Sequence, residues 1–95
     1  MKETIIEIGE IFKRITLVKK DLIGKKIYGV PRGGATCLAY AFGYLGDVFT
    51  IVDNPKDADI IFDDLLDSGA TKTKFKLINP KAKFVVLFDK QKELE

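Results

Sequence analysis

The chain has 95 residues, so it can enclose one hydrophobic core, and we expect a single domain over residues 1–95. Its composition, 46% hydrophobic and 32% charged, is typical of a folded globular protein and excludes a disordered or fibrous chain. The formal net charge is +2, and the basic and acidic residues are interspersed. We therefore expect no general binding of nucleic acid, which needs a concentrated basic face.

The single cysteine, Cys37, excludes an internal disulfide, and the lack of histidine excludes the usual zinc sites. Any metal would have to be held by oxygen ligands. No apolar run approaches the ~20 residues of a membrane span or resembles a signal peptide. These features predict a cytoplasmic protein without membrane contacts.

The first predicted element is a helix over residues 4–20, where apolar side chains recur at three- and four-residue steps. A short strand is expected over residues 26–30, because Pro31 lacks a backbone donor and disfavours helix at the preceding residue. Arg32, Gly33 and Gly34 then form a turn. An Ala- and Leu-rich helix follows over residues 35–44 and ends near two glycines.

Residues 48–52 are β-branched or aromatic and predict the second strand, and residues 60–63 predict the third. A helix is expected over residues 71–78, stopped by Asn79 and Pro80, before a last strand over residues 84–88. Strands that alternate with helices predict an α/β fold with a small, mostly parallel sheet of about four strands and flanking helices.

The link at residues 53–59 is too short to contain the helix that normally joins neighbouring parallel strands. The second strand must therefore be antiparallel, or parallel but separated from the third strand by another. We favour the second arrangement, in which an extended link returns alongside one short strand.

The segment at residues 60–71 is a buried strand followed by acidic residues, small residues and a helix start. In open parallel sheets, ligands bind at the carboxyl ends of the strands. Asp63 and Asp64 could bind vicinal hydroxyls there, directly or through Mg²⁺, and backbone amides of small residues at a helix start favour phosphate. The pattern suggests ribose phosphate. The same residues could instead only cap a turn.

These residues resemble the type I phosphoribosyltransferases, whose signature is an apolar strand, two acidic residues and a Ser/Thr-Gly phosphate loop. The likeness spans most of the chain and is strongest to bacterial members that act on xanthine and guanine, including the turn at residues 79–82. Residues 29–34, Gly-Val-Pro-Arg-Gly-Gly, are similar to the pyrophosphate loop of the family. On its own, this segment could be a simple glycine turn.

The resemblance implies a role for each matching residue. Asp63 and Asp64 would contact the ribose hydroxyls and the magnesium–pyrophosphate group, and Asp67 would act as a catalytic carboxylate near the purine. Lys90 would bind the base. The resemblance implies that pyrophosphate is bound by Arg32, Gly33 and Gly34, and the 5-phosphate by Ser68, Gly69, Ala70 and Thr71. Asp67 could equally be a turn residue, and Lys90 a solvated lysine.

The chain departs from the family in two places. The link at residues 53–59 is too short for the mobile loop that excludes water in the relatives, and there are five residues after Lys90 where the relatives continue into a hood over the base. We therefore expect either a minimal phosphoribosyltransferase, using phosphoribosyl pyrophosphate, a purine or related base and Mg²⁺, or a non-catalytic module that binds phosphoribosyl pyrophosphate or a nucleoside monophosphate.

A receiver-like phosphoacceptor domain is disfavoured, because its acidic pair ends the first strand and here the pair follows the third. The missing hood would leave Leu65 and Leu66 near unprotected apolar surface. We therefore expect a homo-oligomer, or a separate partner, to cover the site.

Overall fold

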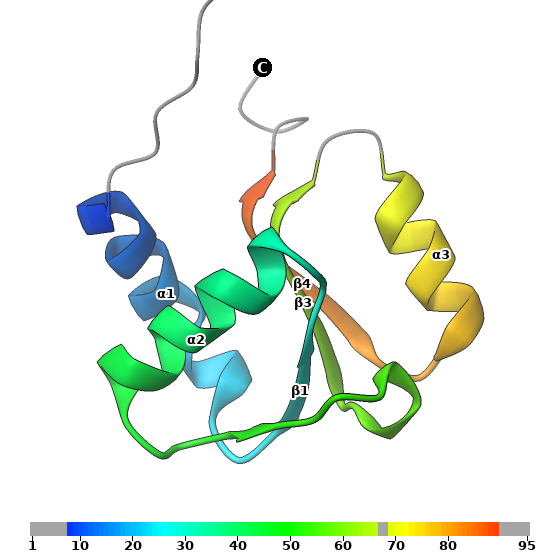
Figure 1. Cartoon of the computed structure of the whole chain (residues 1–95), viewed down its shortest axis with the longest axis horizontal. Helices are drawn as coiled ribbons and strands as arrows, with labels where there is room; N and C mark the ends of the chain where they lie inside the picture. The colour runs from blue at the N-terminus through cyan, green and yellow to red at the C-terminus, as the bar shows by residue number, and fades with distance from the viewer. Residues whose placement is uncertain (1–7, 67–68, 90–95) are drawn as a thin grey trace, which may run out of the picture.

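A computed structural model describes residues 8–66 and 69–89 of the chain, which form a four-stranded parallel sheet with helices on both faces (Figure 1). The strand order is β2-β1-β3-β4. The elements in chain order are α1 (Ile8–Leu22), β1 (Lys26–Gly29), α2 (Gly33–Leu45), β2 (Thr50–Ile51), the 3-10 turn η1 (Pro55–Asp57), β3 (Ile60–Leu66), α3 (Ala70–Ile78) and β4 (Lys83–Asp89). The expected fold class is confirmed.

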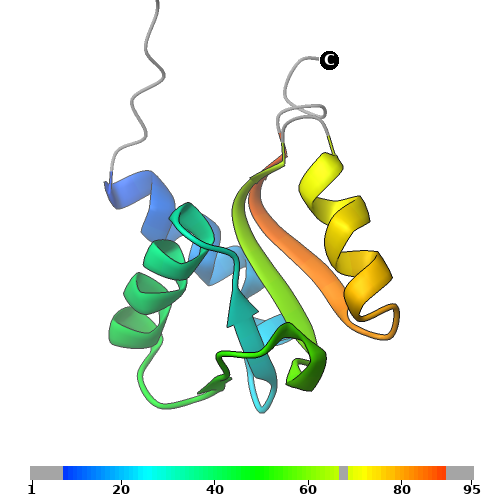
Figure 2. The ribbon, with the colours of Figure 1, turned by 45° about the vertical axis from the view of Figure 1, so that its right-hand side comes forward.

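The sheet separates two hydrophobic clusters. Helices α1 and α2 cover one face and α3 covers the other (Figure 2). Ile15 of α1 and Leu38 of α2 pack with Phe62 of β3 in the larger cluster, while Ile61 packs beneath Phe75 of α3 in the smaller one. Because side chains alternate across a strand, the buried β3 supplies both cores.

The link between β2 and β3 confirms the favoured arrangement. Strand β2 is parallel to β1, and β1 lies between β2 and β3. The link packs on the same side as α3, with Ala58 in the smaller cluster, and contains the single turn η1. The Asn79 side chain holds it in place by donating to the carbonyl oxygens of Pro55 at 2.9 Å and Ala58 at 3.0 Å.

Two predicted strand boundaries are wrong. Strand β2 contains only Thr50 and Ile51, and β3 continues past Asp63 to Leu66. The extension exists because β4 pairs alongside it, with Leu65 opposite Phe88. The acidic pair therefore lies inside the strand. No helix among the described residues is both long and apolar enough to cross a membrane.

Candidate functional site

The carboxyl ends of β1 and β3 form the place in this sheet where a ligand is expected. From β1 the chain passes through α2 to β2 on one side, and from β3 it passes through α3 to β4 on the other. The two helices lie on opposite faces (Figure 2). In open α/β sheets such a reversal leaves a crevice between the two strand ends.

The start of helix α2 is pressed against β3. Gly33 and Gly34, which the sequence predicted to lie in a turn, form the first residues of this helix. A Cβ atom on Gly34 would lie 2.6 Å from the Phe62 carbonyl oxygen, and one on Gly33 would lie 2.6 Å from Cγ of Asp64. Such distances exclude any side chain at these positions without movement. The Pro31–Arg32 peptide bond is cis, and the Ala35 amide donates to the Val30 carbonyl oxygen at 2.9 Å. The structure thus brings the predicted pyrophosphate loop and the acidic pair together.

The acidic side chains accept backbone hydrogen bonds of their own strand. Asp63 Oδ1 accepts from the Asp64 amide at 2.8 Å, and Asp64 Oδ1 accepts from the Leu65 amide at 2.9 Å. The ladder between β1 and β3 ends where the Val30 amide donates to the Phe62 carbonyl oxygen. Beyond that point the Asp64 amide has no hydrogen-bond partner on β1, and it donates to the Asp63 carboxylate instead.

The strand was expected to end at Asp63, but this residue lies inside β3 and is buried, with 7% of its surface exposed. Burial, the hydrogen bond with the Asp64 side chain and the negative charge of Asp64 together raise the pKa of Asp63 to about 7, although the hydrogen bond from the Asp64 amide lowers it. At neutral pH the Asp63 carboxyl group is therefore protonated for about half of the time. Asp64 is half-buried, and its carboxylate faces Gly33.

The carboxylate pair fits a hard cation. Two adjacent carboxylates that otherwise repel each other would be stabilised by Mg²⁺, which prefers oxygen ligands. No group of three or more His, Cys, Asp or Glu side chains within residues 8–66 and 69–89 could hold a metal. A bound Mg²⁺ would therefore take its other ligands from water and from phosphate oxygens, as it does with nucleotide substrates.

The predicted phosphate loop is described from Gly69 onward. Gly69 has φ +85°, a conformation that favours glycine, and it precedes α3 with no side-chain cap on the helix. Ala70 and Thr71 form the first turn, so the positive end of α3 lies at the carboxyl end of β3. Ser68, Asp67 and Lys90 lie outside the described residues.

Arg32 stands at the start of α2 and is exposed. Within the described part of the chain, its guanidinium makes no hydrogen bond or ion pair, so it is available to an anion. A hollow of about 300 Å³ adjoins the same turn on the β2 side, with Pro31, Ala35 and Asp53 in its lining.

Two residues have roles beside the site that the sequence alone did not assign to them. A Cβ atom on Gly29 would lie 2.7 Å from Cα of Ala35, so this glycine lets α2 start directly above β1. The signal was an isolated glycine in a strand, which often marks a close backbone approach. Cys37 is buried below the acids, and burial, followed by the charges of Asp64 and Asp63, raises the pKa of its thiol. Only the fold could reveal that neighbourhood.

No protein-family model matches this sequence, and no curated protein is detectably similar to it.

Proposed function

We propose that this chain binds phosphoribosyl pyrophosphate and acts as a minimal phosphoribosyltransferase on a purine or related base. The observation that supports the proposal is the contact between Gly33 and Gly34, at the start of α2, and the Asp63–Asp64 pair at the reversal point of the sheet. An anion-binding turn, two carboxylates and a helix start then surround one crevice, which suits a sugar that carries phosphate at both ends.

Each part of the ligand has a matching group in this arrangement. The backbone amides of Gly33 and Gly34, with the Arg32 guanidinium, would hold the pyrophosphate. Asp63 and Asp64 would bind the ribose hydroxyls and Mg²⁺, which would neutralise the leaving group. The 5-phosphate would lie at the start of α3, against Gly69, Ala70 and Thr71 and beside Ser68.

Catalysis would need two further side chains. Asp67 would share a proton with the base, and its charge would stabilise the positive sugar of the transition state. Lys90 would bind an exocyclic oxygen of the purine. Both roles come from the resemblance to the phosphoribosyltransferases.

Calorimetry tests the binding step. Phosphoribosyl pyrophosphate should release heat with the native chain, more strongly with Mg²⁺, and nucleoside 5-monophosphates should bind at the same place. Asp64→Asn should weaken the Mg²⁺-dependent part by about tenfold or more. Asp57→Asn, which changes an exposed acid of η1, is the matched control and should bind normally. If neither ligand releases heat, this function is excluded.

The second candidate is a non-catalytic module that binds phosphoribosyl pyrophosphate or a nucleotide. It is favoured by the link at residues 52–59, which Asn79 holds in place and which therefore cannot close over a ligand. A transfer assay with a panel of bases separates the candidates. Turnover that Asp67→Asn abolishes without loss of ligand affinity indicates an enzyme. Binding without product from any base indicates the module.

A further inference from the structure

The outward side of α2 differs in chemistry from the remainder of this highly charged chain. Between Arg32 and Asp47 the sequence contains no charged residue, although 32% of all residues are charged. About half of the helix is nevertheless exposed. We call this surface the neutral face; it consists of Thr36, Ala39, Tyr40, Phe42, Gly43 and Tyr44.

Aromatic side chains make up most of the neutral face. Tyr40, Phe42 and Tyr44 expose 41%, 37% and 53% of their surfaces. At 150–250 Å² for a full aromatic side chain, this is roughly 200–330 Å² before the smaller residues are added. The depletion of charge and the enrichment in tyrosine, rather than the size, are characteristic of protein interfaces.

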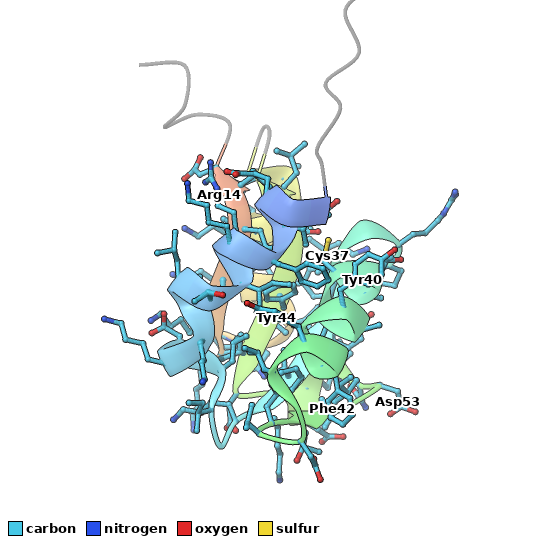
Figure 3. All side chains as sticks on the ribbon, turned by 90° about the vertical axis from the view of Figure 1, so that its left-hand side faces the viewer. Arg14, Cys37, Tyr40, Phe42, Tyr44 and Asp53 are labelled. Atoms are coloured by element: carbon cyan, nitrogen blue, oxygen red, sulfur yellow. The ribbon has the colours of Figure 1, made fainter. Side chains whose placement is uncertain are left out.

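The tyrosines are held in place before any partner binds. Phe12 of α1 stacks on Tyr44 with ring centres 4.8 Å apart and meets Tyr40 edge-on at 6.3 Å. Figure 3, which faces α1 and α2, shows Tyr44 toward α1 and Tyr40 and Phe42 along α2. Side chains that are already ordered lose little entropy on binding, which makes them effective contact residues.

The charges at the two ends of the helix indicate the partner. Arg32 precedes α2 and Asp47 follows it, and both are exposed. When two copies of α2 pack antiparallel around a two-fold axis, Arg32 of each copy faces Asp47 of the other, and the helix dipoles oppose each other. Ala39 then lies near the axis, and Gly43 one turn further on, so small residues allow the helices to approach closely.

We propose that the neutral face of α2 binds a second copy of this chain, forming a two-fold dimer of antiparallel α2 helices. The dimer buries the tyrosines and places Asp47 of the second copy beside Arg32. This surface lies on α2, away from the predicted hood region near Leu65 and Leu66. The dimer can be tested without any ligand, and it gives Arg32 a second role beside the one proposed for pyrophosphate.

A pair of substitutions tests the surface. Ala39→Glu places like charges near the axis, and because Ala39 is exposed and Glu favours helix, the monomer should fold normally. Leu77→Glu adds the same charge to a leucine that is 82% exposed on α3, on the other face of the sheet. Circular dichroism and urea unfolding confirm that both variants are folded.

Sedimentation velocity between about 1 µM and about 1 mM measures the association. The native chain and Leu77→Glu should dimerise alike. Comparing the two Glu variants at equal concentration separates the effect of the position of Ala39 from the general effect of an added charge. Ala39→Glu should weaken the dimer by about tenfold or more. A native chain that remains monomeric throughout, or equal weakening by both substitutions, would overturn the proposal.

A mixing experiment tests the antiparallel arrangement. In a dimer of Arg32→Asp, acids would face acids at the helix ends, and in a dimer of Asp47→Arg, bases would face bases. Each variant alone should therefore dimerise about tenfold more weakly. Both changes suit the helix, since Asp is a good N-cap and Arg favours a carboxyl end. An equimolar mixture pairs opposite charges at both ends and should recover native association. A mixture that associates no better than its components contradicts the arrangement.

Discussion

Gly34 shows how closely the start of α2 approaches β3, since a Cβ atom there would lie 2.6 Å from a backbone oxygen and 3.0 Å from Cα of Asp63. The obstacle is backbone, which cannot rotate away as a side chain could. The geometry of the candidate site therefore depends on the absence of one methyl group.

Gly34→Ala should destabilise the fold by about 1–3 kcal/mol, because the start of α2 must move away from β3, and it should weaken ligand binding. Gly9→Ala is the matched control. Nothing lies within 4 Å of a Cβ atom at that position of α1, so alanine should stabilise the chain by about 0.5–1 kcal/mol. Urea unfolding measures both. Equal effects of the two substitutions would show that the contact at Gly34 is unimportant.

Because of Asp63, the free energy of unfolding should fall as the pH rises. Its pKa in the folded chain is about 7, above the ordinary value of 3.8, so the folded state holds a proton that the unfolded state releases. This contribution is complete below about pH 4 and is lost progressively up to about pH 7. Asp63→Asn keeps an acceptor for the Asp64 amide but cannot ionise.

The Asn variant should therefore be more stable than the native chain at pH 8, by about 1–3 kcal/mol, and the difference should shrink toward pH 5. Urea unfolding at several pH values measures the difference. If the stability of the native chain and that of Asp63→Asn depend on pH in the same way, the Asp63 carboxyl group does not titrate near neutrality.

At the level of elements, the link at residues 52–59 behaves as a fixed strap because one side chain binds it. Asn79 follows α3, and its amide group donates to the Pro55 and Ala58 carbonyl oxygens. Its side-chain oxygen accepts from the Ala82 amide at 3.2 Å. These bonds join the link to the turn between α3 and β4, two segments that are 21–24 residues apart at the bonded positions.

Asn79→Asp removes the donors and should cost about 1–3 kcal/mol, since buried carbonyl groups lose their partners beside a new charge. Asn54→Asp provides the matched control in the same link. The Asn54 side chain only accepts, from the Lys56 amide at 3.0 Å, and a carboxylate accepts equally well. Hydrogen exchange should accelerate across the link in the first variant alone. Similar exchange in both variants would indicate that Asn79 is not required.

On the scale of the whole molecule, β3 joins two thin cores. Phe62 is completely buried beneath α1 and α2, whereas Ile61 is buried beneath α3. A domain of this size has little excess stability, so neither core can compensate for a defect in the other.

Phe62→Ala should cost about 3–5 kcal/mol and leave a large share of molecules unfolded at 37 °C. Leu77→Ala changes a side chain that is 82% exposed and should stay within about 0.5 kcal/mol of the native chain. Thermal unfolding followed by circular dichroism compares them. If Phe62→Ala melts like the native chain, the two-core description is wrong.

Much of this architecture was predictable from local sequence. The periodicity of apolar residues, Pro31 and the glycine-bearing turns predicted three helices and four strands in the observed order, and the short link predicted that β2 and β3 are not neighbours. These features depend on backbone preferences and on chain length, which are properties of neighbouring residues.

Other features required the assembled sheet. Pairing with β4, more than twenty residues away, extends β3 past Asp63, and packing against α2 buries that carboxyl group and changes its pKa. The contact of Gly33 with Asp64 also joins segments about thirty residues apart. The sequence by itself thus determined which elements form and where acids and glycines occur. Only the tertiary structure decided which of them meet and how they ionise, because burial and long-range pairing depend on the whole fold.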